Sequence, residues 1–512
     1  MERSKLVRAL YLAITTVFVL SMVLTGCGAE KNSATSTTGQ NSAIQTAADE
    51  TKTELEFVKL KYYLPQPYTD MSNKDSIMAE VNKILKEKIN AELDLILLDM
   101  NNYQEKINVM SASGESWDIC WGMNLSSLVN KAAIYPLNEL LDKYGKSITQ
   151  KTPEKLWPAV TYSGEKMGVI NLQPYVARHG ACAQKSLTDK YNIDVANIKT
   201  LKDLEPFLET IKKNESGIIP FLPTKTAYPM MFNSIYDKIN EWLIYDTTDN
   251  QLKIWLDAAN NLEEYKVLNS WYKKGYIAAD AALKNDGVAE VKTQKYAVFG
   301  DPGVITGDGS KATTMYGFPC VDIDMGVQGF ISTGGVQSTV SVIGKKSDNP
   351  ERAMMFLDLL HSDLKLFNTL CYGLEGQDYK VVSGAGTDNP TIEVNSEMKW
   401  AIWHPWIGDV VYDQWPSNWN DASALTEFQK NMEEGKTSPI LGFTFDPTNV
   451  KTEVGQLDAI ATEVLPIFVT GSAPDFDKYV ADTKQRMEKA GLAKVLEEAN
   501  KQLTEWKAVN GK

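Results

Sequence analysis

Cysteine is scarce in this chain and is spread so widely that it forms none of the common functional spacings. Four cysteines follow Cys27, namely Cys120, Cys182, Cys320 and Cys371, and no two of them stand near each other in sequence. The CxxC spacing of redox sites and of zinc sites is therefore missing. Cys120 and Cys371 stand among large apolar residues, which predicts buried thiols. The sequence leaves open whether any pair forms a disulfide.

Histidine and the usual catalytic motifs are equally sparse. The three histidines, His179, His361 and His404, are far apart and none stands in an H-E-x-x-H frame, so each is predicted to be a surface or packing residue. No G-x-S-x-G elbow occurs, and the glycine-rich residues 300–303 and 307–311 lack phosphate-loop spacing. We therefore expect no catalytic residue, no metal and no cofactor. Carboxylates are abundant, so the sequence leaves a glycosidase pair open.

Positive charge and long apolar runs are also in short supply. The chain has 66 acidic and 52 basic side chains, which gives a formal net charge of -14. An acidic surface is a poor partner for nucleic acid or for an anionic membrane face. Beyond the N-terminus, no apolar run reaches the length needed to span a bilayer. We expect no nucleic-acid partner and no membrane-spanning segment in the body of the chain.

The N-terminus has the order of parts found in a secretory signal. Three basic residues precede a stretch that is almost wholly apolar, and residues 1–26 are predicted to be a signal peptide. Residues 24–27 (LTGC) resemble the bacterial lipobox, whose cysteine receives a diacylglycerol thioether and begins the mature chain. Cys27 is therefore predicted to carry palmitate-type acyl chains. An uncleaved membrane anchor is the alternative, because no charge falls between residues 9 and 29.

Residues 27–53 are predicted to be a disordered tether. They consist largely of Ser, Thr, Ala, Gln, Asn and Gly, and such a composition cannot bury enough apolar surface to offset the entropy of ordering. A lipidated cysteine with this tether would hold a soluble body at the outer face of a cell membrane, with no other membrane contact. The remaining residues, from 54 onward, are numerous enough for two domains, each with its own core.

Strand and helix patterns alternate along the body of the chain. Apolar residues alternate with polar ones in residues 58–62, as in a strand, and recur at helical spacing in residues 77–89. Short apolar runs at residues 93–98 and 117–121 continue the series. This alternation predicts an α/β fold with a parallel sheet that is covered on both faces. The C-terminus is predicted to be helical, with one apolar face in residues 495–506.

Tryptophan gives the clearest functional signal. Five tryptophans crowd into residues 400–419: Trp400, Trp403, Trp406, Trp415 and Trp419. Asp and Asn stand between them, and indole faces beside such polar groups are typical of sugar sites. Core packing is the alternative for any single indole. Because Pro and Gly break the segment into irregular chain, the cluster as a whole is hard to bury, and we expect one or two rings to face ligand.

Five motifs, in this order along the chain, resemble those of one family. They are residues 117–121 (WDICW) with 132–140 (AAIYPLNEL), 164–169 (GEKMGV), 349–357 (NPERAMMFL), 372–376 (YGLEG) and 441–446 (LGFTFD). Together they resemble the extracellular solute-binding proteins of family 1. These are the carbohydrate-type lipoprotein receptors of ABC importers, here in a Gram-positive branch with a distinct C-terminal helical region. Met167 stands where the second motif usually has an aromatic residue.

The resemblance implies a two-lobe α/β fold of the class II periplasmic-binding-protein type, with hinge strands that allow closure on ligand. Residues 54–169 and 318–375 would form lobe 1, residues 170–317 would form lobe 2, and the mainly helical residues 376–512 would pack across both. The implied function is capture of a carbohydrate, an oligosaccharide in particular, and its delivery to the transmembrane subunits of an ABC permease. The protein would act as a monomer and would not be an enzyme.

The ends of the predicted strands nominate the substrate-binding residues of such a fold. Trp121, Trp415 and Trp419 would stack on sugar rings, and Asn124, Asn171 and Asp301 would bind hydroxyls. The full set is Gln66, Trp121, Asn124, Asn171, Tyr175, Tyr228, Asp301, Trp415 and Trp419.

Three other functions compete with carbohydrate capture. An oligopeptide receptor of the same fold is the closest, because aromatic and Asp or Asn side chains also line peptide clefts. A surface glycosidase or lyase would need a carboxylate pair across the cleft. A cell-surface adhesion or sensor protein would have a shallow pocket or one dedicated to a peptide.

Overall fold

The structure is a computed structural model. It describes residues 55–66, 71–173, 175–176, 178–223, 236–284, 287–300, 309–386, 390–395, 397, 399–403, 406–409, 415–416, 429–430 and 432–512. Cys27, Tyr228, Asp301 and Trp419, which the sequence nominates, lie outside the described residues. In the described part of the chain, no helix is long and apolar enough to cross a membrane.

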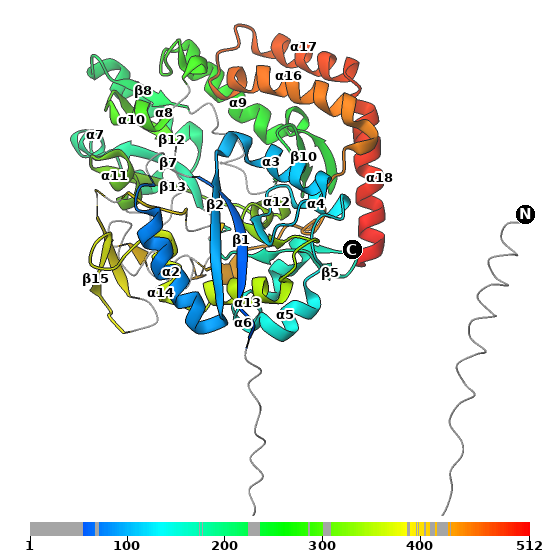
Figure 1. The fold of residues 1–512 in the computed structure, drawn as a ribbon. Coiled ribbons are helices and arrows are strands. Elements are labelled where there is room, and N and C mark those ends of the chain that lie inside the picture. Colours follow the sequence, from blue (N-terminus) through cyan, green and yellow to red (C-terminus); the bar gives the residue numbers. More distant parts are fainter. Residues whose placement is uncertain are drawn as a thin grey trace, which may run out of the picture. The chain divides into compact units, whose positions relative to one another are not determined.

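The first sheet is built around the N-terminal strand of the body (Figure 1). Its order is β2 (Ala91–Leu98), β1 (Val58–Pro65), β3 (Ile119–Trp121), β14 (Val340–Ile343) and β6 (Val169–Ile170). β1 pairs in parallel with β2 and β3, whereas β14 is antiparallel to β3 and β6. Three consecutive residues of β1, from Tyr62 to Leu64, are buried. Since neighbouring side chains point to opposite faces, both faces of this strand are covered.

Helices supply that cover. Those in contact with the sheet or with one another are α2 (Lys74–Ile89), α3 (Met100–Ser113), α13 (Pro350–Leu360) and α14 (Leu364–Tyr372). The Tyr62 ring lies against Phe356 of α13, with 5.8 Å between ring centroids. The smaller elements of this part are α4 (Leu125–Asn130), β4 (Thr161–Tyr162), β5 (Glu165–Lys166), α5 (Asn138–Tyr144), α6 (Lys146–Lys151) and α12 (Thr333–Gln337).

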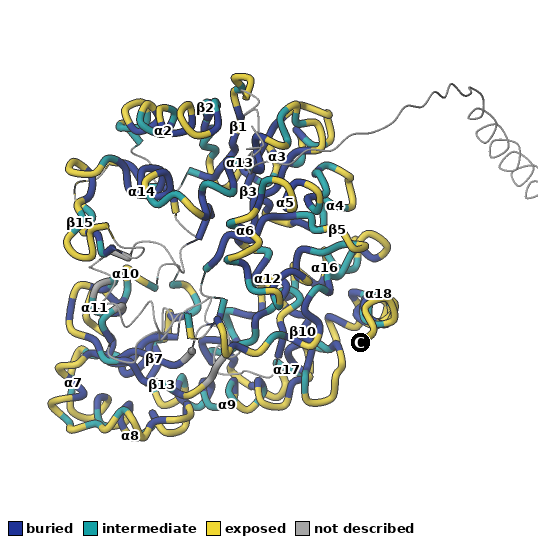
Figure 2. Tube along the Cα trace, turned by 90° about the horizontal axis from the view of Figure 1, so that it is seen from below, coloured by how far each residue is buried: buried dark blue, intermediate teal, exposed yellow. Residues whose placement is uncertain are grey.

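A second sheet has the order β13 (Cys320–Gln328), β7 (Arg178–Gln184), β12 (Tyr296–Gly300) and β8 (Ile219–Leu222). β12 and β8 are parallel, and β7 is antiparallel to both of its neighbours. The other elements here are α7 (Lys185–Lys190), α8 (Leu201–Asn214), β9 (Tyr236–Lys238), β10 (Leu243–Asp246), β11 (Gln251–Ile254), α9 (Ala259–Lys273), α10 (Gly287–Lys292) and α11 (Ser310–Tyr316). Outer helices such as α8 alternate buried and exposed positions (Figure 2). The sequence prediction of a two-lobe α/β fold is confirmed.

Residues beyond 376 divide between the two cores. The strands β15 (Tyr379–Ser383), β16 (Thr391–Val394) and β17 (Trp415–Pro416) form a small sheet, and buried residues around it join the first core. The helices α16 (Lys451–Val469), α17 (Phe476–Lys489) and α18 (Leu492–Asn510) bury their apolar residues in the second core. Before these helices begin, Asp446 Oδ2 accepts a hydrogen bond from Asn130 Nδ2 of α4 in the first lobe at 3.2 Å.

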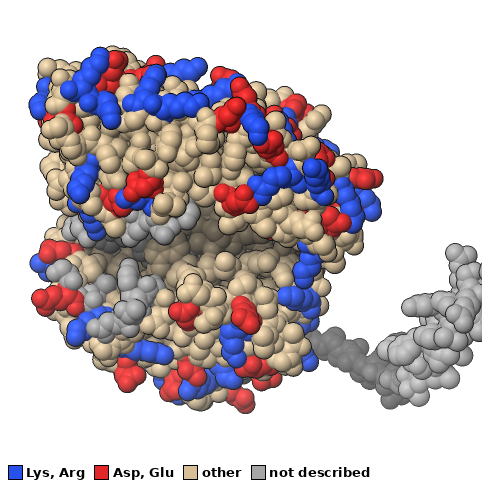
Figure 3. Space-filling model, turned by 90° about the horizontal axis from the view of Figure 1, so that it is seen from above, with Lys and Arg blue, Asp and Glu red and all other residues tan. Residues whose placement is uncertain are grey.

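The chain passes between the two cores near residues 171–178, 328–333 and 432–440. Because β13 pairs with β7 in the second sheet, the chain returns to the first core near Ile331 and not near residue 318. The second and third crossings lie side by side: the Ile331 amide donates to Lys436 O at 2.8 Å, and the Ser438 amide to Ile331 O at 2.9 Å. Figure 3 shows one face of the body hollowed along a groove.

Candidate functional site: an aromatic row at the strand ends

Trp121 occupies the carboxyl end of β3, where a parallel sheet offers its ligand-binding edge. Its side chain is 8% exposed, and its Nε1 donates to Ser338 O at 2.8 Å. The ring lies against Tyr103 on one side and Trp406 on the other, with centroid distances of 5.5 and 5.3 Å. The indole is therefore fixed in place by the protein before any ligand arrives.

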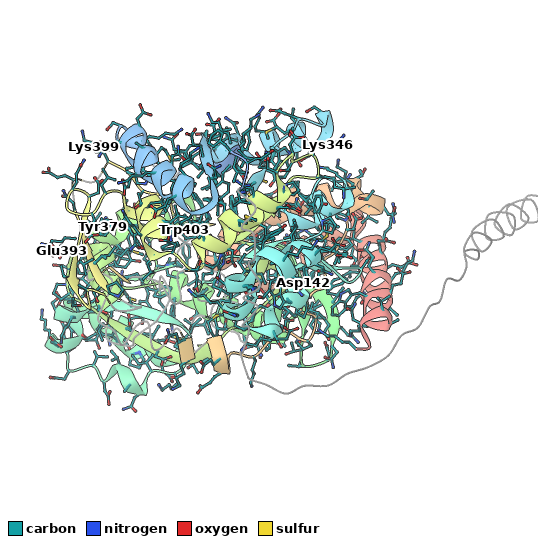
Figure 4. The ribbon with its side chains drawn as sticks, turned by 60° about the horizontal axis from the view of Figure 1, so that its bottom comes forward. Asp142, Lys346, Tyr379, Glu393, Lys399 and Trp403 are labelled. Carbon is teal, nitrogen blue, oxygen red and sulfur yellow. The ribbon has the colours of Figure 1, made fainter. Side chains whose placement is uncertain are left out.

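Three indoles form a row from this strand end to the surface, which we call the aromatic row: Trp121, Trp406 and Trp403. Trp406 contacts Trp403 edge to face, at 5.3 Å between centroids and an interplanar angle of 80°. Trp406 is 4% exposed, whereas Trp403 is 44% exposed. Trp403 is labelled in Figure 4. Large exposed aromatic faces are costly in water and serve as stacking surfaces for ligands. Trp403 is thus the indole of the row that can lie flat against a ligand.

Asn171 ties the aromatic row to the first crossing. Its Nδ2 donates to Trp406 O at 2.6 Å and to Ser341 Oγ at 3.1 Å. Its backbone carbonyl accepts from the Tyr175 hydroxyl at 2.6 Å and from Thr339 Oγ1 at 3.2 Å. The residue is fully buried, so its amide serves the protein's own contacts here. Burial also raises the pKa of Tyr175, which keeps that hydroxyl protonated and able to donate.

The backbone beside Trp406 is fixed as well. The Leu172 amide donates to Gly408 O at 2.9 Å. Asp409 is fully buried and its carboxylate lies 3.4 Å from Lys151 Nζ. A buried carboxylate needs such a partner, since an isolated one is strongly destabilised. Residues 406–409 are therefore held rigidly against the first crossing, which preorganises the aromatic row.

Polar groups lie beside the aromatic row. Gln173 Nε2 donates to Ser338 Oγ at 3.2 Å and to Thr339 Oγ1 at 3.0 Å, and both Gln173 and Ser338 reach the surface. An indole face next to amide and hydroxyl groups can cover the C–H face of a pyranose and bind its hydroxyls. Gln173 and Ser338 are not among the binding residues predicted from the sequence. The one available signal was that Gln173 follows Asn171 by two positions after the hinge strand.

The remaining nominated residues are dispersed. The backbone N–H of Gln66 donates to Leu98 O at 2.7 Å, which places the residue where β1 ends. Asn124 precedes α4 with a φ of 61° and lines a separate cavity of about 410 Å³. Trp415 is described only by its backbone, which pairs with Thr391 of β16. Trp121, Asn171 and Tyr175 are thus the nominated residues that the structure brings together.

Comparisons with known proteins bear on the family and the fold of the chain. A family model described as "Domain of unknown function (DUF3502)" matches residues 439–508. The chain is 28% identical over 451 residues to the carbohydrate ABC transporter substrate-binding protein of Streptococcus pneumoniae serotype 4 (strain ATCC BAA-334 / TIGR4), covering 85% of this chain and 88% of that protein. The crystal structure of the N-glycan transport solute binding protein NgtS from S. pneumoniae matches with a TM-score of 0.78 and 25% identity, over 88% of this chain and 99% of that one.

The chain is thus similar over most of its length to the carbohydrate-type substrate-binding proteins of ABC transporters. The resemblance drawn from the sequence motifs is therefore confirmed. S. pneumoniae FusA in complex with kestose matches at a TM-score of 0.60 and 16% identity, over 88% of this chain and 99% of that one, which extends the likeness in fold.

Other candidate chemistry in this solute-binding protein has a structural role. His361 is fully buried, and its ring nitrogens lie 2.9 Å from Leu357 O and 3.3 Å from Ile170 O, so the ring joins α13 to β6. Cys120, Cys182, Cys320 and Cys371 are buried thiols, not disulfides. Among the described residues, no group of three His, Cys, Asp or Glu side chains could hold a metal ion.

Proposed function

We propose that this solute-binding protein captures a carbohydrate, an oligosaccharide in particular, between its lobes and delivers it to the permease subunits of an ABC importer. The observation that carries the proposal is the aromatic row, which runs from Trp121, hydrogen-bonded to Ser338, to the exposed indole of Trp403. The relatives support the proposal. The relative that is 28% identical is named a carbohydrate ABC transporter substrate-binding protein, and structures of NgtS have been solved in complex with Man1GlcNAc and Man5GlcNAc.

In this proposal the protein binds its ligand without changing it. The relatives are substrate-binding proteins of transporters and not enzymes. Lobe closure around the sugar would make the liganded form recognisable to a permease, because a ligand stabilises the conformation that it binds best. The protein acts as a monomer that carries one cargo at a time.

A thermal-shift and calorimetry panel tests the proposal. The panel holds Man1GlcNAc, Man5GlcNAc, kestose and, as the competing class, tri- to pentapeptides. At least one oligosaccharide should raise the unfolding temperature in a concentration-dependent way, because a ligand that binds only the native state stabilises it by mass action. Chromatography after many hours should return the sugar intact. A response to peptides alone would favour a peptide receptor, and steady product formation would favour an enzyme.

We further propose that Cys27 anchors the protein by lipid at the outer face of the cell membrane of a Gram-positive-type bacterium. The support is the residue order of the signal and of the polar tether in the sequence. Cys27→Ser should move the protein from the membrane pellet to the soluble fraction or the medium, since acyl chains supply the attachment. Ser33→Ala, a change in the same tether, is the control and should stay in the pellet. Equal retention of both variants would contradict lipidation.

A further inference from the structure

One cavity is lined by residues that do not belong to the aromatic row. It has a volume of about 410 Å³ and lies between the start of α4, helix α12, the turn after β9 and residues 440–458. We call it the α12 cavity. None of the three indoles of the aromatic row lines it. Its volume is within the range of small-molecule sites, so it has room for a sugar ring with its hydroxyls.

Carboxylates and amides converge on the α12 cavity. Asp237 is 4% exposed, accepts a hydrogen bond from Ser438, and has its pKa raised to about 6 by burial. Asp458 Oδ1 accepts from Trp242 Nε1 at 2.7 Å, and the Asn124 amide adds a further polar group. The cation of the lining, Lys238, is paired with Glu241 at 2.6 Å. This lining offers acceptors to hydroxyl groups and repels anions.

The other wall of the α12 cavity is apolar. Ile440, Phe443, Phe445 and Val454 line it, and the Phe443 ring is held by Trp506 at 6.0 Å between centroids. An apolar wall opposite convergent acceptors matches a neutral ring that carries C–H groups on one face and hydroxyls on its edge. An acidic or fully apolar molecule fits this lining less well.

Residues of both lobes line the α12 cavity. Asn124 and Gln337 belong to the first lobe, whereas Asp237 and Asp458 belong to elements packed on the second core. Hinge motion would change the distance between these walls, so a molecule bound here would favour one lobe arrangement over the other. By linkage, a ligand in the α12 cavity and a ligand at the aromatic row would each alter the protein's affinity for the other ligand.

We propose that the α12 cavity binds one neutral, pyranose-sized polyol, either a free monosaccharide or the terminal ring of an oligosaccharide held at the aromatic row. This inference rests on the proposed function. It adds a site formed by both lobes and by the C-terminal residues 440–458, beyond the row itself.

A glycine-to-leucine pair tests the inference. Gly334 lines the cavity, has no atom within 4 Å of an added Cβ and has no positive φ, so Gly334→Leu should fold and fill the space. Gly455 in α16 is equally open but does not line the cavity, and Gly455→Leu is the matched control. Ser126→Phe fills the cavity from the first lobe and gives a second variant.

Equilibrium dialysis with mannose and N-acetylglucosamine, and calorimetry with Man1GlcNAc and Man5GlcNAc, then separate the two sources of the ring. If the cavity binds a free monosaccharide, dialysis should find one bound monosaccharide per protein. This binding should persist in Trp403→Ala and be lost in Gly334→Leu and Ser126→Phe. A terminal ring predicts no separate equivalent and at least tenfold weaker Man5GlcNAc binding in both filled variants. If both bind every sugar as Gly455→Leu does, the inference is overturned while carbohydrate capture stands. If the wild-type protein binds no sugar, both fall.

Discussion

Replacing Trp403 with alanine is expected to weaken oligosaccharide binding about 10- to 100-fold. The indole is 44% exposed at the end of the aromatic row, so its truncation removes a stacking face from the ligand. Loss of such a face at a binding hot spot costs about 1–3 kcal/mol of affinity. The unfolding midpoint without ligand should change less than for a core indole, because among the described residues the ring of Trp403 makes one edge-to-face contact, worth about 1 kcal/mol. Calorimetry and chemical unfolding measure the two effects separately.

Trp400 provides the matched control for this experiment. It stands three positions earlier but is 1% exposed, and its Nε1 donates to Leu370 O at 2.8 Å. Trp400→Ala should therefore lower the free energy of unfolding by about 3–5 kcal/mol, as truncation of a core indole does. Wild-type affinity in Trp403→Ala would show that the aromatic row does not face ligand. A large loss of stability in that variant would assign Trp403 to the core.

Replacing Glu264 with glutamine is expected to remove a fall in stability of about 2 kcal/mol between pH 6 and pH 8. Glu264 lies on α9, and its Oε2 is buried with no hydrogen-bond partner among the described residues. Desolvation raises its pKa to about 8. The unfolded chain loses this proton near pH 4.5, so between that pH and 8 the native state holds the extra proton. Stability therefore falls as pH rises through this window, by about 1.4 kcal/mol per unit.

Urea unfolding at pH 6, 7 and 8 measures this difference between wild type and Glu264→Gln. The measurement stays at pH 6 and above because burial also raises the pKa of Asp237, to about 6. The fall in the free energy of unfolding that Asp237 causes therefore lies mainly below pH 6. Glu263→Gln is the control: Glu263 is exposed and paired with Lys266 at 3.2 Å, so the pH dependence should stay as in wild type. Parallel curves for wild type and Glu264→Gln would contradict the assignment.

Local spacing in the sequence was enough to predict the elements of the first lobe. The apolar residues of positions 77–89 become the buried side of α2, and the alternation at positions 58–62 becomes β1. The Asn-Pro pair at 349–350 begins α13, as the family motif indicated. These signals are readable because a helix or strand repeats its buried side over a few residues, so the information is local.

The site could be predicted only as a region. The sequence showed that five indoles lie within residues 400–419. In the structure Trp400 is 1% exposed and Trp403 is 44% exposed, and neither belongs to a helix or strand. Asn171 was expected to bind hydroxyls, yet its amide contacts Ser341 and Trp406, which lie 170 and 235 positions away. In irregular chain no repeat tells which side chain points inward, because distant segments decide it.

From the sequence alone we could predict the α/β class, the positions of many helices and strands, the family resemblance, and a concentration of indoles in residues 400–419. Tertiary structure alone decided which core each C-terminal segment joins, where the chain returns to the first lobe, and which indole faces water. α17 and α18 were predicted as helices, but the core that they join was not. Their apolar residues lie in the second core, where Phe476 of α17 contacts Phe468 of α16 and Phe468 contacts Trp255 and Tyr265. Secondary structure follows local periodicity, whereas burial depends on which surfaces meet when the whole chain has folded.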